Sequence, residues 1–125
     1  MKIKKETDSK LKESIEALEH ALTFAKKIEE DGFYYFGISK CYETCLEYAW
    51  KFCKKRANSE GLEVYSPKDA IRAAGQLKLI DDIEKWIDFL EDRNIGVHDY
   101  LGISRDDYLK TIRSFLTEVK KLADG

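Results

Sequence analysis

Residues 34–57 carry the sequence YYFGISKCYETCLEYAWKFCKKRA, whose spacing of apolar residues predicts one long helix. Apolar and aromatic side chains cover more than one face of this helix, and its basic end suits the negative end of the helix dipole. A helix that is apolar on several sides needs several neighbours. We therefore expect residues 34–57 to form the central helix, in contact with several other helices or with a second subunit.

Four other segments predict helices around this central one. A long helix is expected over residues 9–30, where apolar residues recur at spacings of three and four. A short helix over residues 66–77 begins with a serine N-cap and a proline at the first helical position. Two more long helices are expected over residues 81–94 and 104–122, each opened by acidic residues.

These segments together predict an all-α fold. The expected architecture is an up-and-down helical bundle of four long helices and one short helix, without a strand. A chain of 125 residues and 14.5 kDa fits one domain, residues 1–125, and residues 1–8 are expected to form a flexible N-terminal tail.

The charge balance and the absence of long apolar runs limit the possible functions. Lys and Arg number 22 and Asp and Glu number 24, so the net charge is only −2. This excludes a generally cationic coat for nucleic acid but allows a local basic site. No stretch is apolar enough to span a membrane, and the first ten residues lack the apolar run of a signal peptide.

The cysteine count indicates the redox compartment. Cys41, Cys45 and Cys53 are three in number and lie in one predicted helix, which fits neither a zinc-binding spacing nor a disulfide framework. We expect three free thiols in a reducing cytoplasm, with no metal and no cofactor.

Residues 93–100, RNIGVHDY, contain the side chains best suited to chemistry. On an unbroken helix Arg93 and His98 would lie about 140° apart, but we expect the helix to end near Gly96 and the chain to turn back there. Arginine offers a charged fork for phosphate oxygens, and histidine can move a proton near neutral pH. From the spacing alone, a solvated Arg and His without chemical function remain the alternative.

This stretch resembles the signature of HEPN domains (higher eukaryotes and prokaryotes nucleotide-binding), in which an arginine and a polar residue precede a histidine that follows after four intervening positions. The extension His98-Asp99-Tyr100 is similar to the His-any-Tyr pattern of HEPN toxins that are paired with minimal nucleotidyltransferase antitoxins. Residues 42–51, 66–74 and 79–94 resemble, in the same order, segments of the nucleotidyltransferase substrate-binding family.

The resemblance implies a toxin that cleaves RNA without a metal and acts as a homodimer. Arg93, Asn94 and His98 would be its catalytic residues, and a minimal nucleotidyltransferase antitoxin would neutralise it by transferring AMP to Tyr100. A dimer also follows from chemistry, because one histidine per chain cannot easily serve as acid and base at once. The alternatives are a non-catalytic substrate-binding subunit of a nucleotidyltransferase and a helical bundle that serves only for interaction.

Several residues have both a functional and a structural interpretation. Glu43 lies on a mostly apolar helix face, so it needs a partner if buried, and both interpretations name Arg93. Lys51 could extend a basic rim around the site or belong to a solvated helix end. Asn94 could orient His98 or cap the helix, and Trp50 could be core or stack on a base.

Overall fold

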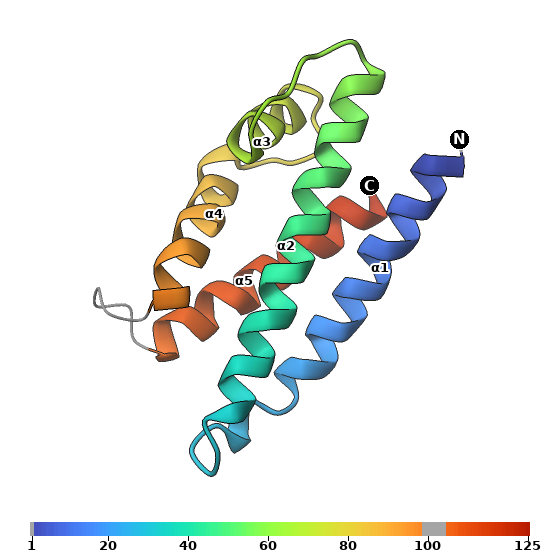
Figure 1. Ribbon diagram of the computed structural model, residues 1–125. Coiled ribbons are helices and arrows are strands. Elements are labelled where there is room, and N and C mark those ends of the chain that lie inside the picture. The colour runs from blue at the N-terminus through green and yellow to red at the C-terminus, as the bar shows by residue number, and fades with distance from the viewer. Residues whose placement is uncertain (1, 99–104) are drawn as a thin grey trace.

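The computed structural model describes residues 2–98 and 105–125, and the side chains of residues 9–93 and 105–125. The described residues contain helices and no strand, which confirms the predicted all-α fold (Figure 1). In chain order the elements are α1 (Lys2–Leu22), the 3₁₀ helix η1 (Ala25–Lys27), α2 (Phe33–Ser59), α3 (Pro67–Gln76), α4 (Ile83–His98) and α5 (Arg105–Asp124).

The long helix α2 is central, as the sequence predicts. Figure 1 shows α1 and α2 side by side as an antiparallel pair, with α5 crossing behind α2 and α4 on the other side. α2 contacts α1, α3 and α4. It also contacts α5, because the ring of Tyr42 packs edge to face on the rings of Tyr108 and Phe115. The several apolar faces of α2 are therefore covered by different helices.

An aromatic cluster ties α2, α4 and α5 together. The Phe115 ring centroid lies 5.1 Å from that of Tyr42, 5.4 Å from that of Phe89 and 5.6 Å from that of Trp86, all edge to face. The Tyr42 hydroxyl donates a hydrogen bond to the Phe89 carbonyl at 3.0 Å. Trp86 and Phe89 of α4 are both buried in this cluster.

Side-chain caps confirm two predicted helix starts. Ser66 Oγ accepts a hydrogen bond from the Asp69 backbone N–H at 3.1 Å and caps α3. Asp82 Oδ1 accepts one from the Lys85 backbone N–H at 3.1 Å and caps α4. Each cap satisfies an N–H group that has no partner within its helix.

The predicted bounds of the first helix are wrong at both ends. α1 begins at Lys2 instead of near Ser9, because the lysine and glutamate residues that precede Ser9 are good helix formers. α1 ends at Leu22 instead of near residue 30, and the ring of Phe24 stacks on Tyr34 of α2 at a centroid distance of 5.7 Å. This contact between neighbouring helices outweighs the local periodicity.

The predicted end of α4 is also wrong. The helix continues through Gly96 to His98, so the chain does not turn back at the glycine. A glycine inside a helix costs only about 1 kcal/mol relative to alanine, which the surrounding helical residues can offset.

The three cysteines are free thiols, as predicted. Burial raises the pKa of Cys45 to about 11 and that of Cys53 to about 12, so both stay protonated at neutral pH. Among the described residues, no helix has the length and apolar character that crossing a membrane requires.

Gly75 and Gly37 offer a matched test of this packing. A Cβ added to Gly75 of α3 would overlap the side chain of Ile83 on α4, whereas a Cβ on Gly37 of α2 would meet nothing within 4 Å. We expect Gly75→Ala to lower the free energy of unfolding by about 1–3 kcal/mol. Gly37→Ala should raise it by about 0.5–1 kcal/mol, because alanine is the better helix former.

Urea unfolding followed by circular dichroism measures both changes. A Gly75→Ala variant as stable as the wild type would show that α3 and α4 do not pack this closely.

Candidate functional site

Arg93 lies on α4 with its guanidinium directed towards α2. Its Nη2 atom is 3.8 Å from Glu43 Oε1, so the partner predicted for Glu43 is confirmed. The side chains of Arg93 and Glu43 are 37% and 23% exposed, which makes this a partly buried ion pair. Arg93 Nε is buried and has no hydrogen-bond partner in the described part of the chain. The guanidinium is thus held by one carboxylate and has further N–H groups to offer a ligand.

Carboxylates and a tyrosine hydroxyl surround this ion pair. Asp92 Oδ2 accepts a hydrogen bond from Thr111 Oγ1 of α5 at 3.5 Å, and burial raises the pKa of Asp92. Burial and the negative charge of Glu43 raise the pKa of Tyr108, whose buried hydroxyl has no partner among the described residues. Tyr108 is therefore neutral at physiological pH, and the carboxylate paired with Arg93 is that of Glu43.

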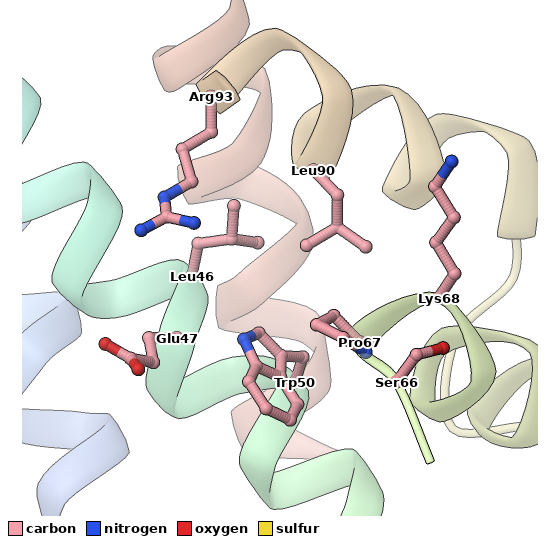
Figure 2. A pocket seen from close by; sticks show the side chains of 8 residues that line it. All are labelled: Leu46, Glu47, Trp50, Ser66, Pro67, Lys68, Leu90 and Arg93. Carbon is pink, nitrogen blue, oxygen red and sulfur yellow. The ribbon is translucent and has the colours of Figure 1, made fainter. Parts of the chain in front are cut away.

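A pocket of about 340 Å³ opens beside Arg93, between α2, the N-terminus of α3 and α4 (Figure 2). The residues that line it are Leu46, Glu47, Trp50, Ser66, Pro67, Lys68, Leu90 and Arg93. Figure 2 shows Arg93 and Lys68 on opposite sides of the pocket, with the Trp50 indole and apolar side chains between them. Small-ligand pockets typically measure about 300–1,000 Å³, so one planar group and its substituents fit here.

The lysine that lines the pocket is Lys68, whereas Lys51 was considered in the sequence analysis as a rim residue or part of a solvated helix end. Lys51 does not line the pocket; its Nζ lies 3.3 Å from Glu47 Oε1 and 5.9 Å from the Trp50 ring centroid. Lys68 lines the pocket instead, with its Nζ 3.2 Å from Glu91 Oε1. The sequence signal for Lys68 was the Ser-Pro start of α3, which predicts that Lys68 lies in the first turn of this helix. It does not predict which neighbouring helix that turn faces.

The remaining predicted site residues are not part of the described geometry. Asn94 and His98 belong to the backbone of α4, and their side chains lie outside the described residues, as does the whole of Tyr100. Because α4 is continuous, positions 93 and 98 are about 140° apart around its axis. A turn at Gly96 therefore cannot be what brings Arg93 and His98 together.

The described side chains can bind an anion and a flat ring. Arg93 and Lys68 supply cationic N–H donors, and the half-buried Trp50 supplies an aromatic face. Within residues 9–93 and 105–125, no three His, Cys, Asp or Glu side chains are placed to hold a metal ion.

Comparison of the fold with solved structures gives matches along nearly the whole chain. The tri-AMPylated HEPN toxin of Shewanella oneidensis, solved in complex with the MNT antitoxin, superposes with a TM-score of 0.83 at 17% identity, over 99% of this chain and 96% of that one. A toxin–antitoxin complex with AMP-PNP gives a TM-score of 0.82 at 16% identity, over 99% and 97% of the two chains. A mutant of the MntA–HpeT toxin–antitoxin complex gives 0.81 at 17% identity, over 99% and 96%.

Comparison of the sequence identifies the family. No curated protein matches the chain. A family model described as nucleotidyltransferase substrate binding protein like matches residues 7–125. The match includes α2, α3 and α4 and therefore every residue that lines the pocket. The chain belongs to the nucleotidyltransferase substrate binding protein like family, and its fold is that of the HEPN toxins.

Proposed function

We propose that this protein is the HEPN-type toxin of a toxin–antitoxin pair, a metal-independent endoribonuclease that a minimal nucleotidyltransferase antitoxin neutralises by AMPylation. The observation that carries the proposal is the position of Arg93, which lines a pocket and, among the described residues, pairs with a single carboxylate, that of Glu43. Its spacing to His98 is that of the HEPN signature. The similar structures, which are toxin–antitoxin complexes, support the same assignment.

The proposed reaction uses one base, one acid and one cation. A base removes the proton from a ribose 2′-hydroxyl, and the 2′-oxygen attacks the adjacent phosphorus. The bond from phosphorus to the 5′-oxygen breaks, an acid protonates that oxygen, and a 2′,3′-cyclic phosphate remains. Arg93 stabilises the charge that develops on the phosphate oxygens. His98 moves protons, and Asn94 orients His98 or binds a phosphate oxygen.

Glu43 has a positioning role in this scheme. Its carboxylate holds the Arg93 guanidinium from α2, and it does not reach the pocket itself. Lys51 does not line the pocket, and its contribution to a basic rim around the site stays a prediction.

A second function, a non-catalytic substrate-binding subunit of a nucleotidyltransferase, is favoured by the description of the family. It predicts the same partner but no RNA cleavage. Expression of the chain alone separates the two, since only a ribonuclease should arrest cell growth without its partner.

The first test is RNA cleavage by the purified chain in EDTA. Arg93→Ala and His98→Ala should each lower the rate on the order of 100-fold or more, because each removes electrostatic or acid–base assistance. Arg72→Ala is the matched control, since Arg72 is an exposed arginine of α3 that pairs with Asp69 outside the pocket. Full activity of both site variants would contradict the assignment.

The second test concerns assembly. If a homodimer places two histidines in one cleft, the rate per chain should fall when the protein is diluted below its dimer dissociation constant. Sedimentation velocity at the assay concentrations gives the fraction of dimer. A stable monomer with undiminished cleavage would refute the composite site.

The third test concerns Tyr100. The phenol oxygen would attack the α-phosphorus of ATP, losing its proton while pyrophosphate leaves, and the added phosphodiester charge would compete with RNA phosphate for Arg93. With the partner and ATP, intact-mass spectrometry should show one or more AMP increments on the wild type and none on Tyr100→Phe.

Tyr65→Phe is the control for this modification, because Tyr65 is 80% exposed and offers a competing acceptor. It should be modified like the wild type. An AMP increment that persists on Tyr100→Phe, or that disappears on Tyr65→Phe, would reject Tyr100 as the acceptor.

A further inference from the structure

The two tryptophans differ in how the fold uses them. Trp86 is 1% exposed and packs edge to face on Phe89 and Phe115. Trp50 is half-buried, lines the pocket and contacts no aromatic ring of the described residues. The Lys51 ammonium lies 5.9 Å from the centroid of the Trp50 ring. Part of Trp50 is therefore available to a ligand.

Arg93 and Lys68 lie on opposite sides of the pocket that Trp50 lines, as Figure 2 shows. Arg93 is 3.8 Å from Glu43, and Lys68 is 3.2 Å from Glu91 with side chains about half exposed. The exposed Lys68–Glu91 pair is worth about 0–1 kcal/mol, so a phosphate can compete for Lys68. Arg93 can bind a phosphate through the N–H groups that its partly buried pair with Glu43 leaves. An aromatic face between cations is the arrangement with which proteins bind single-stranded nucleic acid.

Glu47 is the one carboxylate among the residues that line the pocket. It lies one turn before Trp50 on α2, and its pairing with Lys51 is solvent-exposed and weak. A carboxylate only accepts hydrogen bonds, so it favours bases with an exocyclic amino group. Adenine, cytosine and guanine carry such a group, whereas uracil has no exocyclic amino group and can donate to a carboxylate only through its ring N3–H.

We propose that this pocket is a nucleobase subsite for single-stranded RNA, in which an unpaired base stacks on Trp50 and places its amino group at Glu47. The phosphates that flank this base pair with Arg93 and Lys68. The identity of the ligand as RNA rests on the proposed ribonuclease function. The subsite adds a recognition element, because it selects unpaired over paired RNA and amino-bearing bases over uracil.

Fluorescence of the full chain tests the subsite directly. The probe is a short single-stranded RNA with 2′-fluoro riboses, which cannot be cleaved because the attacking oxygen is missing. Titration should quench the emission of Trp50 while the buried Trp86 gives a constant background. The same oligonucleotide in a duplex should leave the emission unchanged. Unchanged emission at saturation with the single strand, or no binding, would overturn the proposal.

Variants assign the effect to individual side chains. Binding by variants that lack the Trp50 reporter is measured by the fluorescence anisotropy of a dye-labelled copy of the probe. Trp50→Leu should weaken binding on the order of 10-fold or more, whereas Trp50→Phe keeps a ring and should bind within a few-fold of wild type. Phe36→Leu, which removes a 67% exposed ring elsewhere on α2, should bind like wild type. Lys68→Gln should reduce the slope of log K against log salt by about 0.7.

The base preference is tested separately. Replacing one central adenine by uracil in the probe should weaken binding to the wild type, and Glu47→Gln should shrink that difference because glutamine both donates and accepts. Equal discrimination by both proteins would remove Glu47 from the subsite.

Two results separate this proposal from the proposed function. Binding that depends on Trp50, without any cleavage of natural RNA, supports the subsite and refutes the ribonuclease. Cleavage with the same KM in wild type and in a folded Trp50→Leu variant supports the ribonuclease and refutes the subsite. Thermal unfolding establishes that the Trp50→Leu variant is folded. Trp50→Phe retains only the emission of Trp86, so RNA should not quench its fluorescence, and quenching that persists would overturn the assignment to Trp50.

Discussion

The hydrogen bond from the Tyr42 hydroxyl to the Phe89 carbonyl sets α2 and α4 in register, and the aromatic rings around Phe115 enclose it. A buried hydroxyl left without a partner costs about 1–3 kcal/mol, so a shift of α4 along α2 would be penalised beyond the loss of ring contacts. Glu43 follows Tyr42 directly, and Arg93 lies one turn after Phe89. This register is what brings the two charges to 3.8 Å.

The pocket beside Arg93 results from how α3 docks onto that pair of helices. The Ser66 cap fixes the first turn of α3, and Gly75 allows the far end of α3 to approach α4 closely. Lys68 and Pro67 consequently lie opposite Trp50 of α2. The core thus holds one side of the pocket rigidly, whereas the side chains of Arg93 and Lys68 remain partly exposed and able to exchange partners.

Much of the fold follows from local features of the sequence, because apolar periodicity and helix caps operate over distances of three or four residues. The central position of residues 34–57, the start of α3 and the start of α4 were predicted on that basis and are confirmed. The ends of α1 and α4 were not predicted correctly, because a helix ends where contacts from elsewhere in the chain outweigh the helix propensity of its residues. Phe24 stacking on Tyr34 is such a contact.

For the site, the sequence by itself determined that Arg93 and Glu43 form a pair, because a carboxylate on an apolar helix face needs a cation. Only the tertiary structure decided which lysine joins Arg93. Lys51 and Lys68 are both exposed lysines on helices, and nothing local distinguishes them. The packing of α3 against α2 and α4 places Lys68 at the pocket. Lys51 instead pairs with Glu47, which lies one turn earlier on α2 itself.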